Sequence, residues 1–160
     1  MRLTIAAVGR LKAGPERQLV ERYVDRIDKA GRAVALGPVA IREFAEARAD
    51  RMEDRRKAET DMLLGAAEGA GRLIALDERG KAVSSATFAG VLERFRDDGI
   101  ADTAFLIGGA DGHDESLRDR ADLVLSFGPM TFPHQFVRLM LVEQLYRAVT
   151  ILAGHPYHRE

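Results

Sequence analysis

Residues 103–134 read TAFLIGGADGHDESLRDRADLVLSFGPMTFPH, and this stretch decides the fold class. It contains two short apolar runs, at 103–107 and 122–126, whose length is typical of buried strands. A short segment beginning near Asp114 separates them and predicts a helix. Two strands joined by a helical crossover lie parallel in one sheet, so this stretch predicts an α/β fold.

The same alternation of strands and helices continues toward both ends of the chain. The other expected strands are residues 2–8, 33–44 with an interrupting bend, and 72–76, and the other expected helices are near 15–30, 49–69, 84–95 and 134–153. Strands that alternate with helices favour a mainly parallel sheet with helices on both faces. We therefore predict a single domain that spans residues 1–160.

The composition is that of an ordinary globular protein, with 160 residues, 46% hydrophobic and 31% charged. The opening residues lack the pattern of a secretory signal, and no apolar run reaches the length of a membrane span, so a cytoplasmic location is expected. The chain has no cysteine. Disulfides, thiolate metal sites and a cysteine nucleophile are therefore excluded.

Charge is distributed unevenly along the chain, although the net charge is only -1. Residues 1–32 carry eight Arg or Lys against four acids, whereas residues 77–122 carry eleven acids against six bases. A basic N-terminal face is suited to RNA, while the acidic region stays in solvent. On charge alone, ordinary solvated helix faces are the preferred explanation of this distribution.

Three strand ends are the candidate ligand site, because ligands in open α/β sheets bind beyond the carboxyl ends of the strands. These ends are Leu76, residues 107–112 and residues 126–133. Glycines at 108, 109 and 112 allow the backbone to approach a ligand closely. The glycine patterns of dinucleotide and triphosphate sites do not occur. The apolar walls of residues 127–133 suit an adenosyl ligand better than a polyphosphate.

The predicted helix at 134–153 is apolar almost all round, which favours cover by the sheet and by a second subunit, as in a homodimer. His134 at its start is either a hydrogen-bonding residue of the helix terminus or part of the site. Arg138 lies on an otherwise apolar side, which favours pairing in a cleft or across subunits. The spacing of His155 and His158 would permit zinc, but without cysteine or an H-E-x-x-H motif no metal is predicted.

Six short motifs occur in order along the chain. They are Leu76-Asp-x-x-Gly80-Lys81, Ile107-Gly-Gly-x-x-Gly112, Ser126-Phe-Gly-Pro-Met-Thr-Phe-Pro-His134, Arg138, Glu143-Gln-Leu-Tyr-Arg147 and His155-Pro-Tyr-His-Arg-Glu160. Together they resemble the RlmH family of SPOUT-class RNA methyltransferases. The chain departs from the family at Ala110-Asp111, where Pro-Glu is frequent, and at His113, where an apolar residue is common.

The resemblance implies a SPOUT fold with a C-terminal trefoil knot, in a homodimer that methylates N3 of a pseudouridine in large-subunit (23S) rRNA of assembled ribosomes. It implies S-adenosylmethionine as cofactor, with neither DNA nor a membrane as a partner. The cofactor positions that it implies are Leu76, Gly108, Phe127, Gly128, Pro129, Met130, Thr131 and Phe132. The candidate catalytic residues are His134, as a base or base-positioning residue, Arg138, and Tyr157, His158 and Arg159, as a clamp on the base and phosphate.

Two alternatives remain at this point. A non-catalytic ribosome-binding or assembly factor would use the same surfaces, although it has no need of a glycine-lined apolar pocket at 127–133. A flavodoxin-like enzyme would use the same strand ends for another nucleotide, and bound flavin would colour the purified protein yellow.

Overall fold

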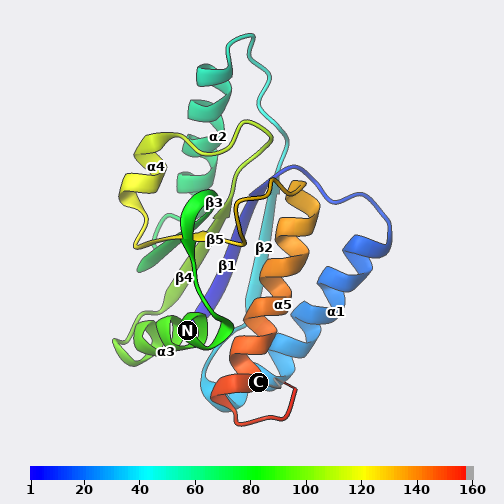
Figure 1. Ribbon diagram of the computed structural model, residues 1–160, viewed down its shortest axis with the longest axis vertical. Coiled ribbons are helices and arrows are strands. Elements are labelled where there is room, and N and C mark those ends of the chain that lie inside the picture. Colours follow the sequence, from blue (N-terminus) through cyan, green and yellow to red (C-terminus); the bar gives the residue numbers. More distant parts are fainter. Residues whose placement is uncertain (158–160) are drawn as a thin grey trace.

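The computed structural model describes residues 1–157 and contains one five-stranded sheet of order β2-β1-β4-β3-β5 (Figure 1). Every neighbouring pair of strands is parallel, which confirms the predicted α/β class. The strands are β1 (Arg2–Val8), β2 (Val39–Phe44), β3 (Arg72–Ala82), β4 (Asp102–Ile107) and β5 (Leu123–Ser126). The helices are α1 (Pro15–Ala30), the 3-10 turn η1 (Gly31–Val34), α2 (Met52–Ala66), α3 (Ser85–Asp97), α4 (Glu115–Arg120) and α5 (His134–Leu152).

Side chains of the interior strand β1 point alternately into two apolar cores. Leu3 and Ile5 belong to the core beneath α1, α3 and α5, whereas Ala6 and Val8 belong to the core beneath α2 and α4. Figure 1 shows these two groups of helices on opposite faces of the sheet. A strand buried on both faces is apolar almost throughout rather than alternating with polar residues, as β1 is. The prediction of helices on both faces is confirmed.

The expected strand at 33–44 is wrong in its first half. Only Val39–Phe44 pairs with β1, and Gly31–Val34 forms a 3-10 turn instead. The chain folds back here, since the Leu36 amide donates to the Gly31 carbonyl at 2.9 Å. A Cβ on Gly31 would overlap the Leu36 carbonyl, so glycine permits this turn.

Helix α5 obtains most of its cover from its own chain. It packs between α1 and α3, and the structure buries seven of its residues, including Leu141, Leu145 and Val149. The side chain of Phe136 remains 47% exposed near the start of the helix. The other residues of the helix are partly or well exposed, and their cover by a second subunit stays a prediction. The knotted path of the chain stays a prediction.

Within residues 1–157, no helix combines the length and the apolar character that crossing a membrane requires.

Candidate functional site

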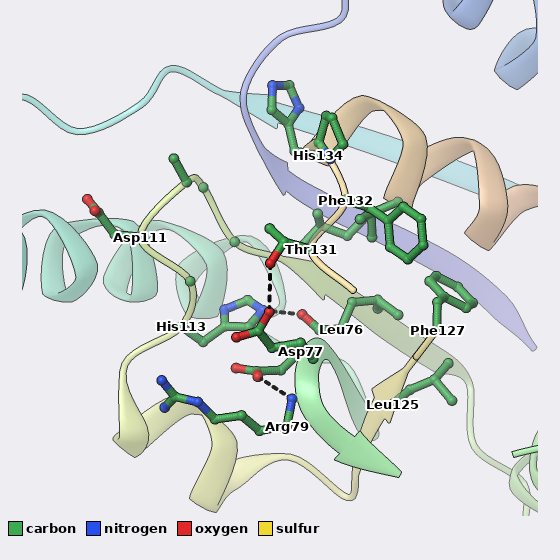
Figure 2. A pocket seen from close by; sticks show the side chains of 18 of the residues that line it. Leu76, Asp77, Arg79, Asp111, His113, Leu125, Phe127, Thr131, Phe132 and His134 are labelled. Carbon is green, nitrogen blue, oxygen red and sulfur yellow. Dashed lines mark hydrogen bonds between the residues drawn. The ribbon is translucent and has the colours of Figure 1, made fainter. Parts of the chain in front are cut away.

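A cavity of about 690 Å³ lies beyond the carboxyl ends of β4 and β5 and beside the segment of β3 that follows Leu76 (Figure 2). This volume falls within the range of small-molecule sites, about 300–1,000 Å³. Three strand-end segments supply most of its lining, namely Leu76–Arg79, Ile107–His113 and Phe127–His134 without Pro129, and the remainder comes from Met52, Arg56, Arg118, Leu125 and Val137. The three strand ends that the sequence indicated therefore meet at one site.

Seven of the eight expected cofactor positions line this cavity. They are Leu76, Gly108, Phe127, Gly128, Met130, Thr131 and Phe132. Pro129 is the exception, because it is not among the lining residues. That these residues bind a cofactor stays a prediction, but the structure does bring them together.

A bulge in β3 forms one lip of the cavity. The sequence indicated that this strand ends at Leu76, but it resumes, so that Leu76 and Lys81 both lie opposite Leu125 of β5. Glycine at 80 allows the chain to pair with β5 again after the bulge, since a Cβ at this position would come within 2.5 Å of the Val124 carbonyl oxygen. The apolar pattern of residues 72–76 contained no signal for this second half of the strand.

The bulge is tied to the loop that follows β5. The Thr131 hydroxyl donates to the Glu78 carboxylate at 3.1 Å, and the Ser126 hydroxyl lies 3.2 Å from the Glu78 carbonyl. Figure 2 shows the Thr131 contact reaching across the mouth of the cavity. Two strand ends thus hold one another in place around the opening.

His113 forms part of the cavity floor and joins β3 to the turn after β4. Its ring is 4% exposed, and its Nε2 lies 3.0 Å from the Leu76 carbonyl oxygen. Because a carbonyl only accepts, Nε2 carries the proton and Nδ1 is left as an acceptor. That Nδ1 is buried and has no partner among the described residues. Burial lowers the pKa of His113, which keeps the ring neutral at pH 7.

We predict that a His113→Leu substitution weakens the acid sensitivity of the fold. With the native pKa depressed, the unfolded chain binds the extra proton first, so stability is full above about pH 6.5 and falls as pH drops toward the native pKa. The variant does not lose this part of its free energy of unfolding, which amounts to about 1.4 kcal/mol for each unit by which the native pKa is lowered. Urea unfolding of both proteins from about pH 8 to about pH 5 measures it.

The expected result is a difference between variant and wild-type unfolding free energies that shifts in favour of the variant as the pH falls. The charges that act on this ring, Asp77 and Arg118, are present in both proteins and cancel in the comparison. Glu59, whose raised pKa makes the stability change with pH in the opposite sense, is also present in both proteins, so its contribution cancels as well. A difference that stays constant with pH would show that His113 titrates normally.

His134 lies at the cavity rim, at the start of α5, directly over Gly9. A Cβ on Gly9 would overlap the imidazole ring, and Gly9 also has a φ of 88°, so both space and backbone require glycine. Burial and the charge of Arg138 lower the pKa of His134. A neutral imidazole therefore stands at the rim, where it is able to accept a proton.

Arg138 lies below His134 and outside the cavity lining. Its side chain is fully buried, and it donates to the Glu43 carboxylate and, at 2.8 Å, to the Gly9 carbonyl. Pairing was expected for this residue, but the partners are Gly9, directly after β1, and Glu43 of β2 in the same chain, rather than groups of a cleft or of another subunit. Arg138 thus supports the segment on which the His134 ring rests.

Tyr157 follows the carboxyl end of α5, and its side chain folds back along the helix toward Tyr146 and Glu143. Its hydroxyl is 3.3 Å from both the Tyr23 hydroxyl and the Glu143 carboxylate, and burial with these contacts raises its pKa. Glu143 follows His134 by nine residues of α5, so the Tyr157 hydroxyl lies roughly 14 Å along the helix from His134. The other two expected clamp residues, His158 and Arg159, lie outside the described residues.

Helix α2 forms the remaining wall, which sequence patterns did not indicate. Arg55 pairs with the Asp111 carboxylate at 2.7 Å, and Arg56 donates to the Asp111 carbonyl at 2.6 Å. Beneath them Glu59 is 4% exposed, and a Cβ on Gly109 would come within 2.7 Å of its carboxylate. Burial raises the pKa of Glu59. Only the packing of α2 on the sheet reveals these contacts.

In the part of the chain from residue 1 to 157, no three His, Asp or Glu side chains gather closely enough to hold a metal ion.

Comparison with known proteins identifies relatives along the whole chain. A family model described as "Predicted SPOUT methyltransferase" matches residues 1–158. The chain is 57% identical over 159 residues to "Ribosomal RNA large subunit methyltransferase H" of Xanthobacter autotrophicus, and 55% identical to the protein of the same name from Rhizobium leguminosarum. Each alignment covers 99% of both chains.

Among solved structures, a "probable methylase family protein" from Haemophilus influenzae superimposes with a TM-score of 0.51. The sequence identity is 7%, and the match covers 99% of this chain and 70% of the other. At that identity the likeness concerns the fold alone, and it agrees with the layered parallel sheet described above.

Proposed function

The chain belongs to the SPOUT methyltransferase family, and we propose that it methylates large-subunit ribosomal RNA with S-adenosylmethionine as the methyl donor. We further propose N3 of a pseudouridine in the assembled ribosome as the target, and hence a cytoplasmic location. The observation that carries the proposal is the convergence of three strand ends on one cavity with a neutral histidine at its rim.

The cavity suits S-adenosylmethionine in size and in lining. Phe127 and Phe132 supply apolar surface for an adenosyl group, and Gly108 leaves the backbone accessible. The unpartnered Nδ1 of His113 shows that hydrogen-bonding capacity remains at the floor. When bound, this cofactor would supply a methyl group activated by a positively charged sulfur, and the carboxylate of Glu78 at the lip complements such a charge.

Methylation of N3 requires that the N3 proton leaves as the new nitrogen–carbon bond forms and the sulfur–carbon bond breaks. In this proposal His134, which lines the cavity, accepts the proton, because its lowered pKa keeps the imidazole neutral at pH 7. The same residue is held in one position by Gly9 beneath it. Orientation of two bound reactants supplies up to about 7–11 kcal/mol of the acceleration, so a strong base is unnecessary.

We also propose that the protein acts as a homodimer. The Tyr157 hydroxyl is held at Glu143, roughly 14 Å along α5 from His134, so both residues would serve one site if the carboxyl end of one subunit reached the cavity of another. Exposed apolar side chains near the cavity, Met130 at 70% and Phe136 at 47%, support a contact on that side. A two-fold dimer would then build two equivalent sites.

The proposal is tested by calorimetric titration with S-adenosylmethionine, followed by methyl transfer to ribosomes that lack the modification. Mass spectrometry of the isolated rRNA then locates the methyl group. Binding with transfer to N3 supports the full proposal. Ribosome binding without any binding of the cofactor would instead favour the assembly-factor alternative, which the size and lining of the cavity disfavour.

A Gly108→Val substitution is expected to raise the Kd for S-adenosylmethionine at least about tenfold, a loss of about 1.4 kcal/mol. Even a Cβ at Gly108 would lie 3.2 Å from the His113 ring, and the larger side chain would project among the cavity-lining residues. The matched control is Gly90→Val on α3, where a Cβ meets nothing within 4 Å. Equal affinities in the two variants would place the cofactor elsewhere.

A further inference from the structure

The two sides of the cavity differ in charge. On the side of β3 and β4, carboxylates and guanidinium groups neutralise one another, as Arg118 does with Asp77 at 3.4 Å and Arg55 with Asp111 at 2.7 Å. Glu78 adds a further carboxylate to this side. Arg56 and Arg79 line the same side, so its acidic and basic groups largely offset one another, and an approaching phosphate would meet little net charge.

On the other side, beyond the rim residue His134, the segment between β1 and α1 contacts this histidine at Gly9, although none of its residues lines the cavity. This segment is anchored, because the Leu11 side chain is 7% exposed and its amide donates to the Glu43 carboxylate at 3.0 Å. The anchored Leu11 leaves the side chains on either side of it, Arg10 and Lys12, exposed. Two cations thus stand on a fixed backbone beside the rim.

The charges of these two cations are not neutralised by neighbouring side chains. Neither Arg10 nor Lys12 forms an ion pair with any residue from 1 to 157. The nearest anchored acid, Glu43, already accepts from Arg138 and lies 3.6 Å from Arg17. Residues 9–15 themselves contain no acid. The segment therefore keeps its positive charge available for a ligand.

We infer that Arg10 and Lys12 bind phosphodiester groups of the RNA substrate, so that the nucleic acid enters from the side of β1 and places its reacting base over His134. This inference rests on the proposed function and adds the direction of approach. Cations beside the rim fit a backbone contact, since Lys and Arg supply most of the affinity for phosphates while base contacts supply the specificity. The short reach from Gly9 to His134 puts phosphate and base contacts within one nucleotide or two of each other.

The test reverses both charges in an Arg10→Glu/Lys12→Glu variant. The matched control, Arg32→Glu/Arg94→Glu, makes the same change at two exposed arginines on η1 and α3, at the opposite end of the molecule (Figure 1). For each protein we would measure kcat/KM for methyl transfer to unmodified ribosomes over a range of salt concentrations, together with the Kd for S-adenosylmethionine.

We expect kcat/KM at low salt to fall about 100-fold in the Arg10/Lys12 variant, and the slope of log kcat/KM against log salt to become shallower by about 1.5. The Kd for the cofactor and the rate at saturating ribosomes should stay at wild-type values, which separates lost RNA affinity from lost structure. The control variant should retain both the activity and the slope.

Two failures are distinguishable in this design. If the wild type transfers methyl groups and the Arg10/Lys12 variant matches the control in activity and slope, the inferred phosphate site is overturned while the proposed function stands. If the wild type itself transfers no methyl group to ribosomes, the proposed function fails and the inference fails with it.

Discussion

A Glu43→Ala variant is expected to unfold with a free energy about 3–5 kcal/mol lower than that of the wild type. Arg138 is fully buried, and after the substitution only the Gly9 carbonyl remains to compensate its charge. The Leu11 amide loses its acceptor as well. For a chain of this length the change corresponds to a fall in Tm of about 6–20 °C, measurable by urea and thermal unfolding.

The complementary variants separate charge from packing. Arg138→Met should lower the free energy of unfolding less than Glu43→Ala does. The Glu43 carboxylate that Arg138→Met leaves unpaired is 20% exposed and reaches solvent more easily than the buried guanidinium that Glu43→Ala leaves unpaired. The double variant Glu43→Ala/Arg138→Met removes both charges and should recover part of the loss. A Glu43→Ala variant that loses less than about 1 kcal/mol would mean that the guanidinium finds another partner.

A His134→Ala variant is expected to lower the single-turnover rate of methyl transfer about 10²- to 10⁴-fold, the usual contribution of a positioned base. Because the pKa of His134 is lowered, the imidazole is neutral above that pKa, and the wild-type rate should fall as pH drops through it. This fall in rate on the acidic side of the pH profile, the acid limb, should disappear in the His134→Ala variant. The Kd for S-adenosylmethionine should change little, since other residues supply most of the lining.

Gly9→Ala serves as an independent test of the same role without removing the imidazole. The added Cβ would overlap the His134 ring and displace it from the rim, so the rate should fall while the acid limb persists with a shifted midpoint. If His134→Ala retains the wild-type single-turnover rate, the proton leaves by another route and His134 is a structural residue of the helix start.

The layered fold and the place of the site follow from local patterns. Apolar runs such as residues 103–107 predicted buried strands correctly, and Gly108 and the run after Ser126 indicated the strand ends that meet at the cavity. These features are readable because a buried parallel strand must be apolar on both faces and a close backbone approach needs glycine. Neither requirement depends on distant residues.

Other features have no local cause. The bulge of β3 arises because Lys81 and Leu76 both register with β5, and the charge of Arg138 is balanced by Glu43, which lies 95 positions away in the chain. Pairing partners of this kind are chosen by the packing of whole elements, so a single position contains no signal for them. The same applies to Glu59, whose burial depends on where α2 crosses the sheet.

By itself the amino-acid sequence determined the α/β class, the order of strands and helices, and which strand ends and glycines form the cavity. It could do so because the spacing of apolar residues and the conformational freedom of the backbone are properties of short segments. Only the tertiary structure decided that Arg138 supports the segment beneath His134, that the Tyr157 side chain folds back onto Glu143 of α5, and that Arg10 and Lys12 belong to a segment that contacts His134. Each of these depends on distances between elements, which arise when the sheet and helices close around their cores.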